Sequence, residues 1–385
     1  MSGPHDAPPE WDEALCAAAL ASIGLSPSRL RVLLADRRPS DAWAALAAGD
    51  HDGDPDRLLR SKATPRLLEQ TADRLAGAGV DVRVLGLPGY PVVLESDPEP
   101  PAVLFAAGDL AVLSGQARVA VVGTRSASPT GRDIAREFGR ALAAAGVSVV
   151  SGLARGIDTA AHDGALAAPG GAPPVGVAGT ALDASGDGAQ TALRNEVAAR
   201  GVVLSEIPPG VGGARWRFAV RNRIMAALAA VVVVVESHER GGAFHTVSAA
   251  RRRDRVVAAV PGSVRSPASA GTNALLAAGA RVVRHAGDVF DLLIGATGLD
   301  PRGAPGSRDW RTRFGSPPTP DTRSRRVPSP AAARVRRALD VNPVALDVVV
   351  DRAGLPVGEV ALALEQLADA GLARGEQGRW SLSRR

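Results

Sequence analysis

Residues 119–152, VAVVGTRSASPTGRDIAREFGRALAAAGVSVVSG, hold the pattern that decides the fold. A short β-branched run over Val119–Val122 leads through a glycine-containing loop into a helical pattern over Thr130–Ala145. A second β-branched run follows at Val147–Val150. Runs that are apolar at consecutive positions are typical of strands buried on both faces of a parallel sheet. The stretch therefore predicts a right-handed strand–helix–strand unit.

The same alternation continues through the middle of the chain. Ala-rich helical stretches separate five further apolar runs, at Val175–Ala178, Val202–Leu204, Val231–Val235, Val256–Val260 and Arg281–Val283. Repeated strand–helix alternation favours an α/β fold with a doubly wound, mostly parallel sheet.

The flanks of this region have other patterns. Residues 1–85 show short helical periodicities, and we assign the sheet domain to residues 86–295. Residues 296–330 are rich in Pro, Gly, Ser and Arg, as a linker is. Residues 331–385 regain three helical patterns and end in a hairpin pattern, which predicts a winged-helix-like domain.

Composition excludes several classes of protein. The chain has 385 residues and a net charge of +5, and its single cysteine, Cys16, rules out an internal disulfide. The longest apolar run, Met225–Val235, is well short of the roughly 20 residues that span a bilayer. No secretory signal pattern opens the chain, so we expect a soluble, cytoplasmic protein. Residues 1–100 hold more acidic than basic residues, and the remainder is basic, which suits a polyanionic partner or a solvated arginine-rich surface.

Common catalytic motifs are absent from the sequence. It has no Walker A loop, no His-Glu-x-x-His, no Gly-x-Ser-x-Gly and no Gly-x-Gly-x-x-Gly after the first strand. We therefore predict no catalytic residues, no cofactor and no metal. Asp158 suits a helix cap, and the lone His162 is more typical of a packed residue than of a catalyst.

Four loops follow strands whose carboxyl ends meet at one sheet edge, which is where ligands of such sheets bind. The first, Gly123–Gly131, is a candidate phosphate loop, since amides at a helix start favour an anion. The loops are predicted to form one basic groove, with Arg125, Arg155, Arg221, Arg223 and Arg240. Ordinary strand–helix turns and a salt-bridge cluster at a helix start are the alternatives.

Taken together, these motifs resemble the DprA/Smf DNA-processing family. The similar segments are the loop after Val122, SGLARGIDTAAH at 151–162, the Arg221–Arg223 block, and the PG, GTN and GA elements between residues 261 and 280. The resemblance covers roughly residues 89–285, and more loosely a SAM-like N-terminal domain and the winged helix. It implies a Rossmann-like dimer that binds single-stranded DNA, protects incoming DNA in natural transformation and loads RecA recombinase. The DNA contacts it implies are Gly123, Thr124, Arg125, Ser128, Gly152, Arg155, Arg221 and Arg223.

This chain departs from the family pattern at two places. Ala181 stands where the family has a second glycine, and Ala184–Gln190 lacks the Tyr-Pro-x-x-Asn stretch. Gly241–Ala243 replaces Ser-Gly-Ser. Two other functions stay open: a nucleotide-acting hydrolase of the lysine-decarboxylase-like class, and a nucleotide-binding sensor. We further expect self-association through Asn273–Leu276 and Val282–Val283, and no DNA reading by the acidic helical stretch at Val357–Ala370.

Overall fold

The computed structural model describes residues 12–50, 59–115, 117–299, 330–340, 343–369, 372–376 and 379–382. They belong to two compact units divided between Phe314 and Gly315. Each unit is described by itself.

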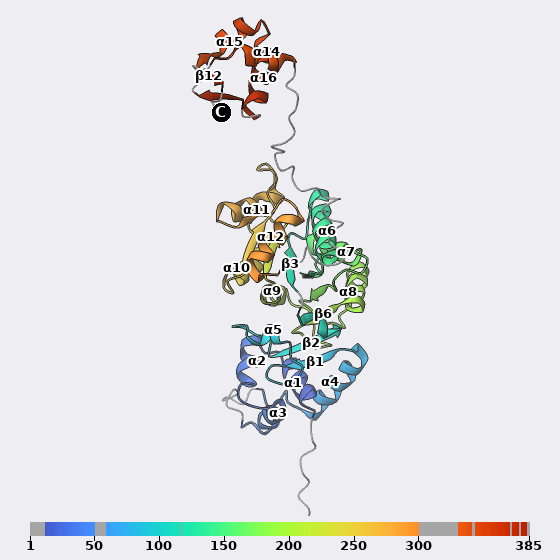
Figure 1. Cartoon of the computed structure of the whole chain (residues 1–385). Coiled ribbons are helices and arrows are strands. Elements are labelled where there is room, and N and C mark those ends of the chain that lie inside the picture. Colours follow the sequence, from blue (N-terminus) through green and yellow to red (C-terminus); the bar gives the residue numbers. More distant parts are fainter. Residues whose placement is uncertain are drawn as a thin grey trace, which may run out of the picture. The chain divides into compact units, whose positions relative to one another are not determined.

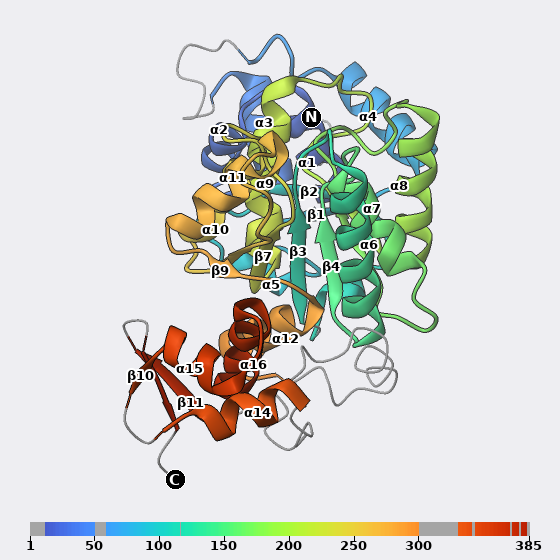
Figure 2. The same cartoon turned by 90° about the horizontal axis from the view of Figure 1, so that it is seen from above.

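A nine-stranded sheet forms the centre of the first unit (Figures 1 and 2), in the order β1-β2-β6-β5-β4-β3-β7-β8-β9. Strands β3 to β9 run parallel to one another, whereas β2 is antiparallel to both β6 and β1. The chain turns from one half of the sheet to the other between β3 and β7. The strands are β1 Asp81–Val84, β2 Val103–Gly108, β3 Arg118–Val122, β4 Ser148–Ser151, β5 Val175–Val177, β6 Val202–Ser205, β7 Val231–Val234, β8 Val256–Ala259 and β9 Arg281–Val282.

Apolar runs without alternation form these strands because both faces of the sheet are covered. In β3, Val119 and Val121 lie in one apolar core, while Ala120 and Val122 lie in the other. Successive side chains of a strand point to opposite faces, so both sets must be apolar. This confirms the predicted doubly wound, mostly parallel sheet, and each predicted strand lies within a residue or two of its observed position. The sequence did not predict β1 and β2.

Helices α6, α7 and α12 contribute to one core, and α9, α10 and α11 to the other. Figure 2 shows α6 and α7 on one side of β3 and β4, and α9 and α10 on the other. The helices of this unit are α1 Glu13–Ser22, α2 Pro27–Leu33, α3 Pro39–Ala48, α4 Pro65–Ala78, α5 Val92–Glu95, the 3-10 turn η1 Leu110–Leu113, α6 Pro129–Ala144, α7 Ile157–Leu166, α8 Gly188–Arg200, α9 Arg215–Leu228, α10 Ala243–Arg251, α11 Pro267–Ala277 and α12 Ala286–Thr297.

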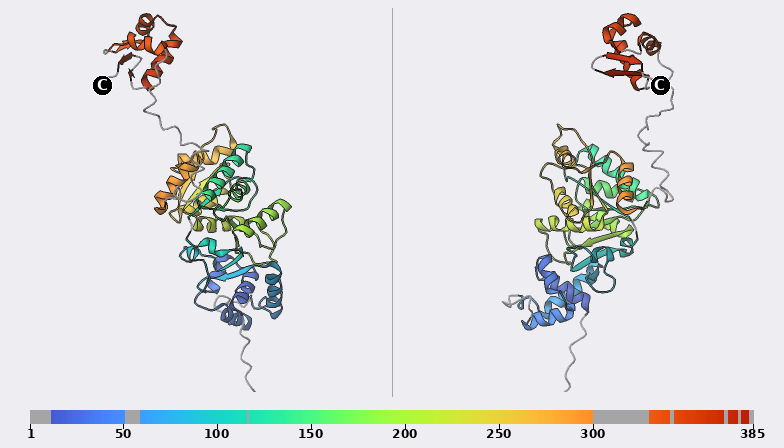
Figure 3. Two further views of the ribbon diagram at one scale, coloured as in Figure 1. Left: turned by 45° about the vertical axis from the view of Figure 1, so that its right-hand side comes forward. Right: turned by 60° about the vertical axis from the view of Figure 1, so that its left-hand side comes forward.

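The N-terminal helices share a core with the antiparallel edge of the sheet. Leu20 and Trp43 are buried in the same cluster as Val84 of β1 and Phe105 of β2. Figure 3 shows these helices at the β1 end of the sheet. Strand β1 begins at Asp81, inside the range assigned to the helical module, so the domain boundary after residue 85 stays a prediction.

The second unit contains α14 Pro330–Ala338, α15 Leu346–Ala353 and α16 Val357–Asp369. A small sheet accompanies them, in the order β10-β12-β11, from Val344–Ala345, Arg379–Leu382 and Ala373–Glu376. The antiparallel β11–β12 pair is the predicted hairpin. Most of the predicted linker, residues 300–329, lies outside the described residues. None of the helices described here has the length and apolar character that crossing a membrane requires.

Candidate nucleic-acid interface

The block Arg221-Asn222-Arg223 lies inside helix α9, which begins at Arg215. The sequence placed this block at the start of a helical stretch over Arg221–Ala230, and the observed helix begins almost two turns earlier. The apolar residues Ile224, Met225 and Leu228 are buried against the sheet one to two turns further on. This packing holds the block over the carboxyl edge of the sheet, which is where the sequence expected it.

Arg221 is a structural cross-link between strand ends. Its side chain is buried, with 5% exposed, and Nη1 donates to the carbonyl oxygen of Gly152 at 2.7 Å and to that of Val177. A methyl group on Gly152 would lie 2.5 Å from both Asp158 Oδ2 and Arg221 Nη2, so a larger residue there would displace these two side chains. Arg221 therefore holds the ends of β4 and β5, and little of its side chain is exposed to a ligand.

The next two residues of the block have similar roles. Asn222 donates to the carbonyl oxygen of Gly242, in the loop after β7, at 3.4 Å. The guanidinium of Arg223 lies 2.6 Å from the carboxylate of Glu206, which follows β6, and both side chains are 9% exposed. The block thus ties four strand ends together, and the salt-bridge alternative describes Arg223 better than a phosphate contact does.

The start of helix α6 already holds an anion from this chain. The Glu236 carboxylate accepts from the backbone N–H of Ser128 at 2.9 Å and from its hydroxyl at 2.5 Å. The N–H of Thr124 donates to the Glu236 carbonyl oxygen at 2.8 Å. A carboxylate at a helix N-terminus is favoured by the helix dipole. The predicted phosphate loop is therefore filled at its helix end, and Ser128 is engaged.

The Arg125–Arg155 cavity lies beside this filled site and encloses about 250 Å³. Its residues follow β3, β4 and β5 or belong to the first turns of α8 and α9. None of its lining residues, all of which the structure describes, is acidic. They are Arg125, Gly152, Leu153, Ala154, Arg155, Ala178, Gly179, Thr180, Ala184, Ser185, Gly186, Gln190, Thr191, Arg194 and Phe218.

Arg125 and Arg155 are the exposed cations of this cavity. The guanidinium of Arg125 lies 5.0 Å from the centroid of the Phe218 ring, an arrangement in which an aromatic face stabilises a cation. Gly156, with φ of 87°, follows Arg155, and a Cβ there would collide with the Thr124 carbonyl oxygen. Cations beside an aromatic face, with no carboxylate among them, suit phosphates and stacked bases.

Sequence reasoning did not find the α8 contribution to the cavity. Gln190, Thr191 and Arg194 lie on one face of α8 near its start, and Arg194 donates to the Ala184 carbonyl oxygen at 2.9 Å. The signal was available, because the helix after a parallel strand begins at the carboxyl edge of the sheet. Arg240 is exposed on the loop after β7 and does not line this cavity.

One of the two segments that depart from the family pattern, Ala184–Gln190, forms part of the cavity wall. Ala184, Ser185 and Gly186 line the cavity, whereas Gly241–Ala243 do not. Asp183 accepts from the N–H of Gly210 at 2.8 Å, so it holds the loop after β6 rather than facing a ligand.

Two titratable groups are buried beneath Gly152. Burial raises the pKa of the Asp158 carboxyl to about 6, although the nearby Arg221 guanidinium opposes the shift. Burial lowers the pKa of His162 to about 4, and none of its side chain is exposed. His162 is thus the packed residue that the sequence favoured.

Comparison with known proteins decides the family. The sequence profile described as DNA recombination-mediator protein A matches residues 82–294, and the DprA winged helix domain matches residues 317–374. The chain belongs to this family. Membership places the chain among DNA-processing proteins.

Three relatives illustrate the family likeness. A DprA protein of Mycobacterium tuberculosis is 36% identical over 354 residues, which cover 86% of this chain and 87% of that protein. The X-ray structure of DprA from Streptococcus pneumoniae is similar with a TM-score of 0.59 at 28% identity, covering 72% of this chain and 97% of that one. A Helicobacter pylori DprA structure, described as showing a unique single-stranded DNA binding mode, is similar with a TM-score of 0.50 at 25% identity. The match covers 56% of this chain and 96% of that one.

Proposed function

We propose that this chain binds single-stranded DNA in the Arg125–Arg155 cavity and delivers it to RecA recombinase during DNA uptake. The observation that carries the proposal is the lining of the cavity, which has three arginines, one aromatic face and no carboxylate. The name of the Helicobacter pylori relative, and the description of the family as a recombination mediator, support the same function.

The chemistry of the cavity predicts how binding depends on salt and sequence. Phosphate contacts release counterions, with a slope of about 0.7 per phosphate in a plot of log affinity against log salt for a single strand. Three arginines therefore predict a slope of about −2. Base stacking on Phe218 tolerates any base, so sequence preference should be weak.

The test measures fluorescence anisotropy of labelled oligothymidylate against duplex DNA across a salt series, with free mononucleotide as competitor. Arg125→Ala and Arg155→Ala should each weaken binding and lower the slope by about 0.7. Arg251→Ala is the matched control, because Arg251 is exposed at the last turn of α10 and outside the cavity. Binding that is flat with salt would contradict the proposal. Full competition by mononucleotide would favour the nucleotide-sensor alternative.

RecA delivery needs a separate measurement. We expect the protein to increase DNA-dependent ATP hydrolysis by RecA on single strands that a single-strand-binding protein already covers. The Arg125→Ala variant should lose this stimulation in parallel with its DNA affinity. Stimulation that persists without DNA binding would contradict delivery through this cavity.

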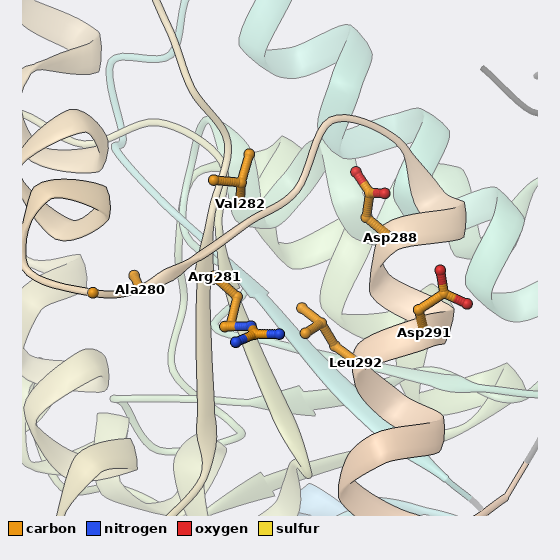
Figure 4. A pocket seen from close by; sticks show the side chains of 7 residues that line it. Ala280, Arg281, Val282, Asp288, Asp291 and Leu292 are labelled. Atoms are coloured by element: carbon orange, nitrogen blue, oxygen red, sulfur yellow. The ribbon is translucent and has the colours of Figure 1, made fainter. Parts of the chain in front are cut away.

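We also propose that two copies associate at the β9 edge of the sheet. Figure 4 shows Arg281 of β9 beside Leu292 of α12, with Val282 farther along the strand, and all three line a cavity of about 450 Å³. Val282 is 53% exposed, and β9 pairs with a strand on one side only among the described residues. Leu275 is 2% exposed and completes the core, so Val282→Glu is the appropriate test. Sedimentation should show a dimer at micromolar concentration and a monomer for Val282→Glu.

A further inference from the structure

Three cavities lie next to one another along the first two turns of α9. The Arg125–Arg155 cavity and a small second cavity share Ala178 and Gly179. The second cavity shares Pro27, Trp216 and Val220 with a third. The second cavity holds only about 10 Å³, so the two larger hollows adjoin through shared residues, and a path from the carboxyl edge of the sheet to helix α2 has to cross α9.

The third hollow, the α2–α10 cavity, encloses about 440 Å³. It lies between α2 of the helical module and the helices α9 and α10, which cover the sheet. Its residues are Ser26, Pro27, Ser28, Arg31, Glu99, Trp216, Ala219, Val220, Arg223, His245, Ser248, Ala249 and Arg252.

The charges of this cavity leave it cationic. Arg223 is paired with Glu206. Arg253 is paired with Asp97 at 2.6 Å and also lies 3.2 Å from Glu99, so the Glu99 carboxylate leaves one negative charge against the two positive charges of Arg31 and Arg252. Arg31 donates to the Pro100 carbonyl oxygen at 3.3 Å and keeps its charge, and Arg252 is exposed. Arg31 and Arg252 are therefore the cations that a ligand in this cavity would meet.

Trp216 lies between the two larger cavities, and it is 49% exposed. The guanidinium of Arg217 lies 5.4 Å from the centroid of its ring. Residues two apart on a helix point in different directions, so Phe218 faces the Arg125–Arg155 cavity while Trp216 lines the α2–α10 cavity. An exposed indole is costly in water but well suited to stacking on a base.

We infer that a single strand of DNA continues from the Arg125–Arg155 cavity across α9, stacks a base on Trp216 and places its next phosphates against Arg31 and Arg252. This inference rests on the proposed function and extends it to the N-terminal module. Helix α2 thereby becomes part of the DNA-binding surface. The strand alternates phosphates and bases, and this path alternates cations and aromatic rings.

The experiment compares oligothymidylates of about 4 and about 15 nucleotides, the range that single-strand sites span. The wild-type chain should bind the longer strand more tightly. Trp216→Ala should weaken binding of the longer strand about tenfold, as stacking removal does, and leave the shorter strand unchanged. Trp216→Phe should restore most of the loss. Arg31→Ala and Arg252→Ala should lower the salt slope for the longer strand only, whereas Arg251→Ala, beside Arg252 but outside the cavity, should not.

Two results would overturn the inference. One is a Trp216→Ala variant that binds the longer strand as the wild type does. The other is an equal loss on both strands, which would show that Trp216 merely shapes the first cavity. Failure of the wild-type chain to bind either strand would instead refute the proposed function, so the two failures are distinguishable.

Discussion

The carboxylate of Glu236 lies 2.5 Å from the hydroxyl of Ser128 and also accepts from the N–H of Ser128. Ser128 in turn caps α6, because its Oγ accepts from the N–H of Gly131 at 2.9 Å. Glu236 follows β7 and Ser128 follows β3, so this contact closes the crevice where the two halves of the sheet meet. An internal carboxylate thus occupies the position at which many such folds bind phosphate.

Glu236→Gln should lower the free energy of unfolding by about 1–3 kcal/mol, because hydrogen bonds to a charged group are lost. Glu239→Gln is the control, since Glu239 is exposed three residues away and should change stability by less than about 0.5 kcal/mol. Urea unfolding of both variants measures the difference. Equal stability of the two variants would show that the Ser128 contact contributes nothing.

Arg223→Met should destabilise the fold by about 3–5 kcal/mol, because it leaves the buried carboxylate of Glu206 without its partner. Replacing both residues, as Arg223→Met with Glu206→Leu, should recover most of that loss. The double variant should bind single-stranded DNA within about twofold of the wild type if Arg223 is structural. A tenfold loss in the folded double variant would return Arg223 to the DNA contacts.

His162 makes stability depend on pH. Its pKa falls from 6.5 in the unfolded chain to about 4 in the fold, so between these values the unfolded state binds the extra proton. The stability that the folded state gains from keeping His162 neutral is complete above pH 6.5 and is lost as the pH falls towards 4. The raised pKa of Asp158 has the opposite effect on the pH dependence of stability. Asp158 is present in both the wild type and the His162→Gln variant, so its effect cancels when the two are compared. The wild type should therefore lose more stability than the variant between pH 6.5 and 4. Parallel curves would contradict this.

The winged-helix unit is predicted not to read DNA. Helix α16 exposes Glu359, Leu362 and Glu365, and the sequence of Val357–Asp369 contains no lysine or arginine. Carboxylates facing phosphates repel them, so this face suits a protein partner better than DNA. Truncation after Phe314, where the two units divide, should leave single-strand affinity within about twofold of the full chain. Tight duplex binding by residues 315–385 would contradict the prediction.

The sequence predicted the strands that are buried on both faces, because burial requires an apolar residue at every position. The runs at Val119–Val122 and Val231–Val235 are apolar throughout because each strand is covered on both faces. Strand β2, Val103–Gly108, was missed because its second half is Ala-Ala-Gly, residues without β preference. A Cβ on Gly108 would collide with the carbonyl oxygens of Ala198 and Gly201. The backbone around the end of α8 therefore requires a glycine at this position.

By itself, the sequence determined the α/β class and the edge of the sheet that carries the loops. It also identified Arg125 and Arg155 as candidate DNA-binding residues. These follow from local patterns, because strand burial and the direction of parallel strands are repeated along the chain. Only the tertiary structure separated the exposed arginines from Arg221 and Arg223. All four belong to segments predicted to lie at the same edge of the sheet, but solvent exposure depends on which carbonyl or carboxylate the fold brings to each guanidinium. Gly152, Val177 and Glu206 provide those partners, from segments 17 to 69 residues away in the chain.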